Sequence, residues 1–422
     1  MNEDRQAKIR ALMDKGVDIH CPDSVDIGIE VDPDRISGEG VRIHRATRIC
    51  GRSTLIMSHT ELGREAPVSV ENCLIGPNVK LGGGFFSKAV FLDGASMKSC
   101  GHVRQGTILE EGARAAHSVA LKQTILFPFV TLGSLINFCD CLMAGGTSAQ
   151  NHSEVGSSYI HFNYTPNQDK ATASLIGDVP HGVMLNQPAI FLGGQGGMVG
   201  PRRMAFGSIV AAGTICRQDE LRPARLILGG GGGLRQQSVP FTGSGFHNTR
   251  QIVAKNILYI GNLFALRQWY LNTRGLFVGQ DFPESLLEGL VRNVRSAIEE
   301  RIRRLGAFCR IMAACGSSQI QVDIHSADNR WLQELGANGN LIEDVLNGQW
   351  RVCGHPEFRE RFLTQVEKAI SRHGSYYVRV IQSLDQDVTA VGTLWLQSIV
   401  KQIDSKIGRL FPEINIGSVT DE

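Results

Sequence analysis

Two basic residues eighteen positions apart, Arg104 and Lys122, form the pair whose spacing points most directly to chemistry. In a chain that winds with an eighteen-residue repeat, this spacing puts both side chains on one wall, on consecutive coils about 4.8 Å apart. Two cations at that distance repel unless an anion bridges them. A phosphate or diphosphate suits the position, because arginine offers a planar fork of donors and lysine a point charge. The alternative is a surface pair neutralised by carboxylates such as Glu110.

The repeat itself is visible in the first half of the chain as a six-residue spacing of aliphatic residues. This spacing links Ile43, Ile49 and Leu55; Ile75 and Leu81; Val103 and Leu109; and Met204, Val210 and Cys216. Neither the 3.6-residue period of a helix nor simple alternation explains it. Three hexads of strand and turn complete one coil of a triangular parallel β-helix, with room for roughly eleven coils. The pattern resembles that of the hexapeptide-repeat acyltransferases, which implies a left-handed parallel β-helix; a glycine-rich antiparallel sandwich is the alternative.

The second half changes to helical patterning. From Asp281 onward, Leu287, Leu290, Val294 and Ile298 recur at three- and four-residue spacing, as on one face of an amphipathic helix. The glycine run before it lacks the Lys-Ser/Thr of a phosphate-binding loop, which favours a hinge. The predicted organisation is an N-terminal helix over 1–16, a left-handed β-helix over 17–228, a Gly-rich linker over 229–245 and an α-helical domain over 246–422.

Composition narrows the functional class. The 422 residues carry a net charge of +2 with 20% charged residues, so no overall field recruits nucleic acid or an anionic membrane. Ten cysteines without a C-x-x-C pair predict reduced thiols and no metal site. Neither a signal peptide nor an apolar run of membrane-spanning length is present in the sequence. We therefore expect a cytoplasmic protein.

Three stretches within residues 8–219 resemble the C-terminal acetyltransferase half of the bifunctional glucosamine-1-phosphate acetyltransferase/N-acetylglucosamine-1-phosphate uridyltransferase family. They are His102-Val-Arg-Gln-Gly-Thr-Ile-Leu-Glu-Glu-Gly-Ala followed by Lys122, the run from Gly156 through Asn163-Tyr164 to Asp178, and Gly207-Ser-Ile-Val-Ala-Ala-Gly-Thr. The resemblance implies a sugar-phosphate or UDP-sugar ligand, acetyl-CoA or another acyl donor, and a homotrimer with sites between subunits. It assigns phosphate binding to Arg104 and Lys122, sugar and donor contacts to Asn163, Tyr164 and Lys170, and a pantetheine contact to Ala212. Asn163 and Tyr164 are alternatively structural residues of the coil.

The sequence departs from this family at the expected general base. Counting from the cation pair, the family histidine falls at Ser134, and a neighbouring tyrosine is replaced by Asn137. Serine alone is a poor base at neutral pH. An insertion is followed by two histidines, His152 and His161. We take His152, together with Ser134, as the candidate catalytic residues, and His161 as the second candidate for the base. The uridyltransferase half is absent from the sequence, so nucleotidyltransfer is not expected.

Three functions remain open on this basis. The first is a hexapeptide-repeat acyl or acetyl transferase related to UDP-N-acetylglucosamine biosynthesis. The second is a non-catalytic nucleotide-sugar-binding or scaffold protein that has lost the base. The third is a purely structural trimer.

Overall fold

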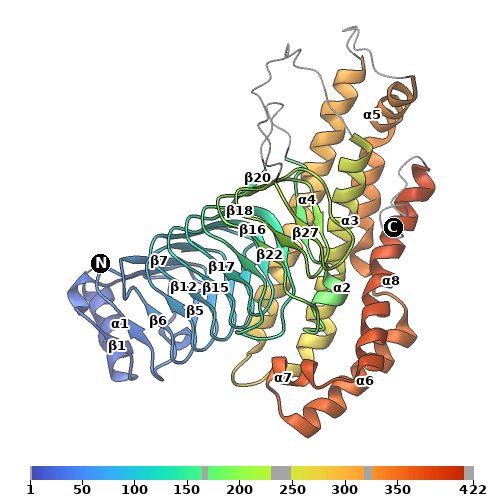
Figure 1. The fold of residues 1–422 in the computed structure, drawn as a ribbon. Helices are drawn as coiled ribbons and strands as arrows, with labels where there is room; N and C mark the ends of the chain where they lie inside the picture. Colours follow the sequence, from blue (N-terminus) through green and yellow to red (C-terminus); the bar gives the residue numbers. More distant parts are fainter. Residues whose placement is uncertain (1, 164–169, 230–248, 318–325, 413–422) are drawn as a thin grey trace.

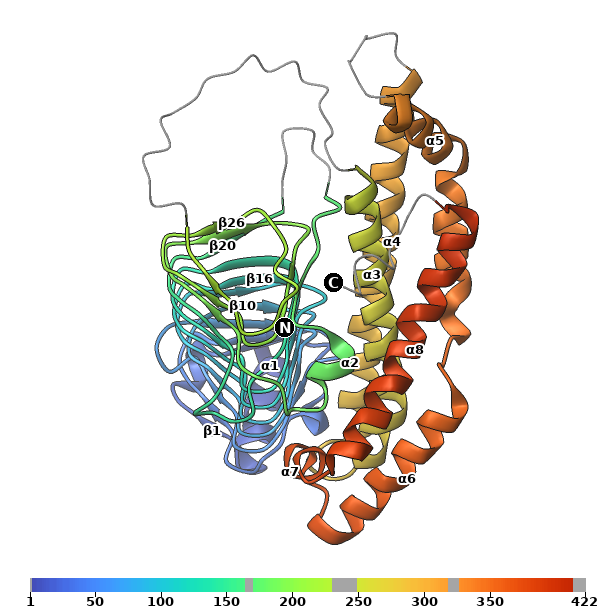
Figure 2. The same cartoon turned by 45° about the vertical axis from the view of Figure 1, so that its right-hand side comes forward.

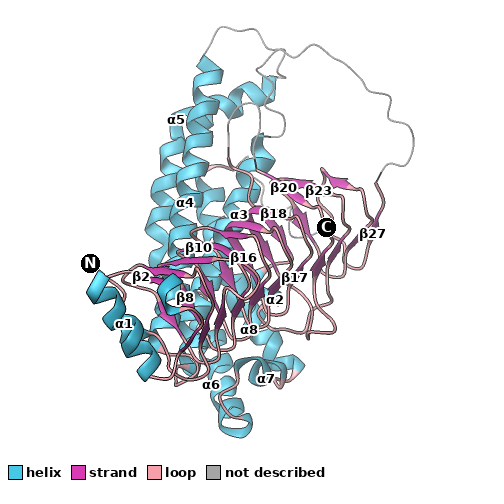
Figure 3. Ribbon diagram, turned by 90° about the vertical axis from the view of Figure 1, so that its left-hand side faces the viewer, coloured by secondary structure: helices cyan, strands magenta, loops and turns pink. Residues whose placement is uncertain are grey.

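The first half of the chain winds into a parallel β-solenoid, and the second half forms long helices that lie along one side of it (Figures 1 and 2). The computed structural model describes residues 2–163, 170–229, 249–317 and 326–412. Helix α1 (Asn2–Asp14) covers the first coil, and strand β27 (Leu226–Ile227) lies at the opposite end (Figure 3). Lys8 Nζ holds α1 in place by donating to Val31 O at 2.6 Å.

Three walls make up the solenoid, and every pairing within them is parallel. Wall A contains β1 (Asp18–Ile19), β3 (Arg42–Ile43), β6 (Glu61–Leu62), β9 (Lys80–Leu81), β12 (Ser96–Met97), β15 (Arg114–Ala115), β17 (Thr131–Leu132), β19 (Glu154–Val155), β22 (Phe191–Leu192), β25 (Ile209–Val210) and β27. Wall B contains β2 (Asp26–Ile27), β4 (Arg48–Cys50), β7 (Val68–Glu71), β10 (Gly84–Ser87), β13 (Gly101–Val103), the first halves of β16 (Ala120–Leu126) and β18 (Asn137–Met143), β20 (Ile160–Phe162), β23 (Gly197–Val199) and β26 (Ile215–Cys216). Wall C contains β5 (Leu55–Ile56), β8 (Leu74–Ile75), β11 (Val90–Phe91), β14 (Ile108–Leu109), the second halves of β16 and β18, β21 (Ser174–Ile176) and β24 (Arg203–Met204). The eleven strands of wall A give the number of coils that the hexad pattern predicts.

The hexad aliphatics fill the interior of the solenoid, with one correction. Ile49 and Ile75 are fully buried, as predicted, but Leu55 is only partly buried and its neighbour Ile56 takes the inward position. Ile56 pairs in register with Ile75. The prediction for Leu55 was wrong because the chain from Ile49 to Ile56 is one residue longer than a hexad, which moves the inward position by one.

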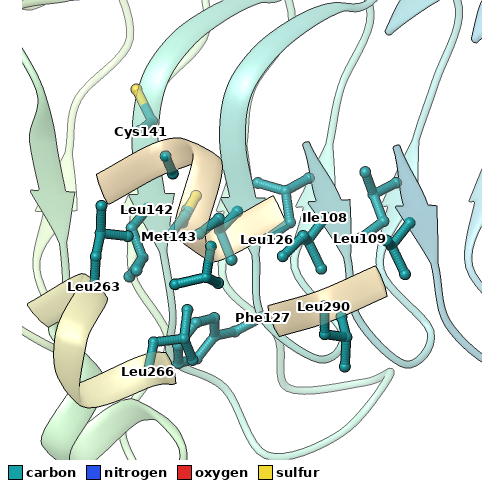
Figure 4. Packing of buried hydrophobic residues seen from close by; sticks show 14 of the residues in the cluster. Ile108, Leu109, Leu126, Phe127, Cys141, Leu142, Met143, Leu263, Leu266 and Leu290 are labelled. Atoms are coloured by element: carbon teal, nitrogen blue, oxygen red, sulfur yellow. The ribbon is translucent and has the colours of Figure 1, made fainter. Parts of the chain in front are cut away.

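Wall C differs from the other walls because both residues of its middle short strands, β8, β11 and β14, are buried, whereas the outward residues of the end strands β5 and β24 are only partly buried. The buried outward-facing residues of wall C are Leu74, Val90, Ile108, Ile125, Leu142 and Leu175. Helices α3 (Thr249–Gln268) and α4 (Glu284–Ser317) cover this wall, and Figure 4 shows its side chains meeting Leu263 and Leu266 of α3 and Leu290 of α4. A Cβ atom added at Gly289 would lie 2.1 Å from Leu74 Cδ1, so a glycine lets α4 approach the wall closely.

The remaining helices are α5 (Ser326–Asn347), α6 (Pro356–His373), α7 (Tyr377–Gln382) and α8 (Gln386–Leu410), with the short α2 (Val179–Gly182) between β21 and β22. They complete the layer seen in Figure 2: α5 packs on α4, α8 on α3, α6 on α8, and α7 on α6. A π-helical turn (Trp269–Thr273) and a 3-10 turn (Arg274–Phe277) follow α3. The predicted linker lies outside the described residues except for Gly229. Within the described residues, no helix is both long and apolar enough to cross a bilayer.

Candidate functional site

Arg104 and Lys122 lie side by side on wall B, on consecutive coils, as the eighteen-residue spacing predicts. Strands β13 and β16 pair with Val103 opposite Leu121, and Arg104 N donates to Leu121 O at 2.9 Å. Arg104 is exposed and Lys122 partly so, and within the described ranges neither has an ion-pair partner. Glu110 does not neutralise them, because it is buried beyond wall C against Tyr270. The pair is therefore open to an external anion.

Two further polar residues continue this surface of wall B. Cys139 pairs in register with Lys122, and Asn137 is an exposed outward residue at the start of the same strand. Burial raises the pKa of the Cys139 thiol in spite of the nearby charges of Lys122 and Arg104. The Cys139 thiol is therefore neutral, and a thiolate nucleophile is not favoured at this position on wall B.

Asn163 and the backbone of Lys170 are both linked to the Asp140–Arg301 ion pair, near the edge where walls B and C join. Asn163 Nδ2 lies 3.5 Å from Asp140 Oδ2, and Asp140 forms a buried ion pair with Arg301 of α4 at 2.8 Å. Arg301 Nη1 also donates to Lys170 O at 3.3 Å. Asn163 is one coil beyond Asp140, so it lies close to the Cys139 end of the surface. Tyr164 is outside the described residues.

Ser134 belongs to a column of corner residues that joins walls A and B, and all of them except His117 are small. Each coil donates a backbone N–H to the one before it: Leu135 N to His117 O at 3.1 Å, Ser158 N to Ser134 O at 2.8 Å, Gln195 N to Ser157 O at 2.8 Å and Gly213 N to Gly194 O at 2.9 Å. The corner column consists of His117, Ser134, Ser157, Gly194 and Ala212. Ala212 lies three coils from Ser134, a distance of about 14 Å at the ordinary strand spacing.

The structure places His117 beside Ser134, a contact that the sequence did not predict. Ser134 Oγ lies 2.9 Å from His117 Nδ1, and His117 is exposed. When Nδ1–H donates to the serine, Nε2 is left with a lone pair that can accept a proton. The available signal was the local coil length: Arg114 pairs with Thr131, seventeen residues later, and the same spacing links His117 to Ser134.

The two histidines singled out from the sequence lie elsewhere. His152 is partly buried in the loop before β19, with Nδ1 2.8 Å from Ala149 O and Nε2 3.7 Å from Glu154. It precedes wall A, whereas Ser134 follows that wall. His161 points into the solenoid, 2.8 Å from Ser174 Oγ, and burial lowers its pKa to about 4. The structure brings neither residue to the cation pair, and a catalytic role for His152 stays a prediction.

Comparison with known proteins gives relatives for the solenoid half. The chain is 28% identical over 226 residues to bifunctional protein GlmU of Thermotoga petrophila, which covers 53% of this chain and 45% of that protein. GlmU of Thermotoga maritima is 27% identical over the same length and shares, and GlmU of Trichlorobacter lovleyi is 26% identical over 218 residues, 51% of this chain and 42% of its own. The chain thus spans less than half the length of the curated relatives it matches. No family model matches the chain.

Among solved structures, the polysialic acid O-acetyltransferase OatWY is similar to 56% of this chain over 91% of its own length, with 11% identity and a TM-score of 0.17. The homology to GlmU and the parallel solenoid together fit a GlmU-like β-helix acetyltransferase domain.

Proposed function

We propose that the chain transfers an acyl group from an acyl-CoA, such as acetyl-CoA, to the amino group of an amino-sugar phosphate or its UDP derivative. The observation that carries the proposal is the corner column, which leads from Ala212 to the His117–Ser134 pair at one edge of wall B. The cation pair occupies the same wall. One surface therefore offers an anion site, a proton acceptor and a track for an extended donor.

The acceptor would lie on wall B with its phosphate on Arg104 and Lys122. His117 and Lys122 are five residues apart, so at about 3.3 Å per residue their backbones are within ~16 Å. The long cationic side chains and a sugar phosphate span that gap. Asn137 and Asn163 supply amides for sugar hydroxyls, and the resemblance adds Lys170 and Tyr164 as contacts to sugar and donor.

The donor would lie along the corner column. Ser157, Gly194 and Ala212 have small side chains, and a Cβ added at Gly194 would lie 2.7 Å from Ser157 O, so nothing larger than glycine fits there. A narrow strip of this kind leaves room for a pantetheine arm against the backbone. An acyl-CoA bound there would supply the thioester.

His117 would act as the general base, with Ser134 holding its ring. His117 Nε2 would take the proton from the attacking amine as the carbon–nitrogen bond forms and the carbon–sulfur bond breaks. The same proton would then pass to the departing thiolate, which balances the reaction. In this role His117, held by Ser134, takes the place of the family histidine, which this chain lacks because position 134 is a serine.

We further propose that the protein forms a homotrimer through walls A and B. Wall C is covered by α3 and α4, whereas the outward residues at the last coils of the other walls are apolar and exposed. They are Phe191, Ile209 and Leu226 on wall A and Ile160, Phe162 and Ile215 on wall B. Light scattering after size exclusion should give three copies, and Ile209→Asp should give a single copy; a monomeric parent protein would refute the trimer.

Thiol release from acetyl-CoA with glucosamine 1-phosphate or its UDP derivative tests the activity. Loss of a charge-assisted contact in Arg104→Ala or Lys122→Ala should raise KM for the acceptor by about 10- to 100-fold. Arg114→Ala is the matched control, because Arg114 is an exposed arginine of the adjoining wall A. No change on removing Arg104 and Lys122 would refute the anion site.

The base is tested separately by substituting the two histidines. His117→Asn should lower kcat by about 100-fold or more while leaving KM for the acceptor nearly unchanged. His152→Asn tests the other histidine: a larger loss there than in His117→Asn would assign the base to His152. If UDP-N-acetylglucosamine raises the melting temperature while no acyl donor reacts or binds, the non-catalytic binding function replaces the transferase.

A further inference from the structure

A cavity lined by none of the corner-column residues lies between the solenoid and the helical part. Its volume is about 420 Å³. The solenoid contributes residues from the corner where wall C turns into wall A, and the helical part contributes the 3-10 turn after α3, the start of α4 and the start of α7. Pockets of this size are typical of small-molecule sites.

Carboxylates dominate the charged lining of this cavity. Four of them, Glu39, Asp93, Glu111 and Asp281, face it together with one guanidinium, that of Arg274, and the imidazole of His59. His59 Nε2 lies 3.5 Å from Glu39 Oε1. Even with this histidine protonated, the lining carries an excess of negative charge.

Two of the carboxylates are stacked on consecutive coils. Gly112 N donates to Asp93 O at 2.8 Å, which places Glu111 one coil beyond Asp93, about 4.8 Å along the stack. Burial raises the pKa of Asp93, and the charges of Glu111 and Asp281 raise it further, while a hydrogen bond from Asn78 Nδ2 at 2.8 Å opposes the shift. The carboxylates of this cavity therefore lie close together, and its cationic side chains are too few to balance their charge.

Glu111 carries an unused acceptor in this cavity. The residue is 6% exposed and its Oε1 accepts from Arg274 Nη2 at 2.5 Å, but its Oε2 is buried without a hydrogen-bond partner among the described residues. An unpaired buried carboxylate oxygen is unfavourable in a folded protein. A donor from a bound molecule would satisfy it.

Aromatic rings complete the lining. The Arg274 guanidinium already lies 3.7 Å from the centre of the Tyr377 ring and 4.6 Å from that of Phe282, which shows that these rings accept a cation. Tyr376 is half exposed at the same cavity. Such rings also pack against the methylene groups of an aliphatic amine.

A metal ion fits this arrangement less well than an extended organic cation. Within the described ranges, no three His, Cys, Asp or Glu side chains are grouped closely enough to hold a metal ion. Glu39 lies three coils from Asp93, about 14 Å along the stack, so the negative charges are spread along the cavity. We propose that this cavity binds an aliphatic di- or polyamine, whose separated ammonium groups pair with Asp93, Glu111 and Asp281.

Isothermal titration and thermal unfolding of the full chain with spermidine test this proposal. We expect saturable one-site binding at near-physiological salt and a rise in the melting temperature. Asp93→Asn and Asp281→Asn should each weaken spermidine binding by at least about tenfold. Glu367→Gln, on the exposed side of α6, removes one negative charge elsewhere and should leave binding unchanged.

The unliganded variants separate binding from folding. Asp93→Asn removes a repulsive charge, so its melting temperature without spermidine should equal or exceed that of the parent while its response to spermidine is lost. Mg²⁺ and trilysine serve as competing probes: tighter binding of Mg²⁺ would assign a metal site, and tighter binding of trilysine would assign a protein side chain as the ligand. Absence of saturable spermidine binding, or equal binding in all variants, would overturn the proposal. The acyltransfer assay does not enter this test, so the two proposals fail independently.

Discussion

Glu110 should make the stability of this protein fall as the pH rises through neutrality. Its side chain is 2% exposed at the contact between wall C and the helices, where the Tyr270 hydroxyl donates to it. Burial, together with the neighbouring charge of Glu111, raises its pKa from 4.5 to about 7. Because the folded state holds the proton more tightly than the unfolded chain, the stabilisation is fully present below about pH 4.5 and is lost as the pH passes 7. At about 1.4 kcal/mol per tenfold difference in proton affinity, the effect amounts to ~3 kcal/mol.

Urea unfolding of the parent protein and Glu110→Gln between pH 5 and pH 8 measures this effect. Glutamine resembles the protonated carboxyl, so the variant should be closest to the parent at pH 5 and gain on it steadily toward pH 8, to a total difference of up to ~3 kcal/mol. Other titrating groups cancel in the difference between the two proteins. Glu367→Gln should show a difference that is flat with pH. If the Glu110→Gln difference is equally flat, Glu110 is ionised in the folded protein and the reasoning fails.

Three further predictions concern the contact of wall C with the helices, the ion pair beside the site, and the corner column. Ile108→Ala should lower the unfolding free energy by about 2–5 kcal/mol, whereas Arg114→Ala, at an exposed position of wall A six residues later, should change it by less than ~0.5 kcal/mol. Equal losses in urea unfolding would contradict the docking described for wall C. Arg301→Met should lower the free energy of unfolding by about 3–5 kcal/mol, because it leaves Asp140 buried and unpaired. Adding Asp140→Asn should restore most of that loss. A double variant no more stable than Arg301→Met would argue against the ion pair. Ala212→Leu should raise KM for acetyl-CoA about tenfold at an unchanged melting temperature, and an unchanged KM would place the donor elsewhere.

The solenoid and its cation pair could be predicted because a β-helix is built from local repeats. Each hexad contributes one strand and one turn, so the position of Arg104 above Lys122 follows from counting residues along the chain. The count fails where a coil departs from the average length. It missed the inward position of Ile56, and it missed the contact between His117 and Ser134, because both lie in stretches whose spacing differs from the regular eighteen or six residues.

The sequence by itself therefore determined the repeat, the wall that carries the cations and the helical character of the second half, since each depends on neighbours at a fixed spacing. Only the tertiary structure decided which wall the helices cover and what lies between the two parts. The helices meet wall C because its outward residues are apolar, and this contact brings Asp281 and Arg274 to the carboxylates of Asp93 and Glu111 from more than 150 residues away in the sequence. No local pattern encodes such a meeting, because it depends on the burial of two surfaces against each other.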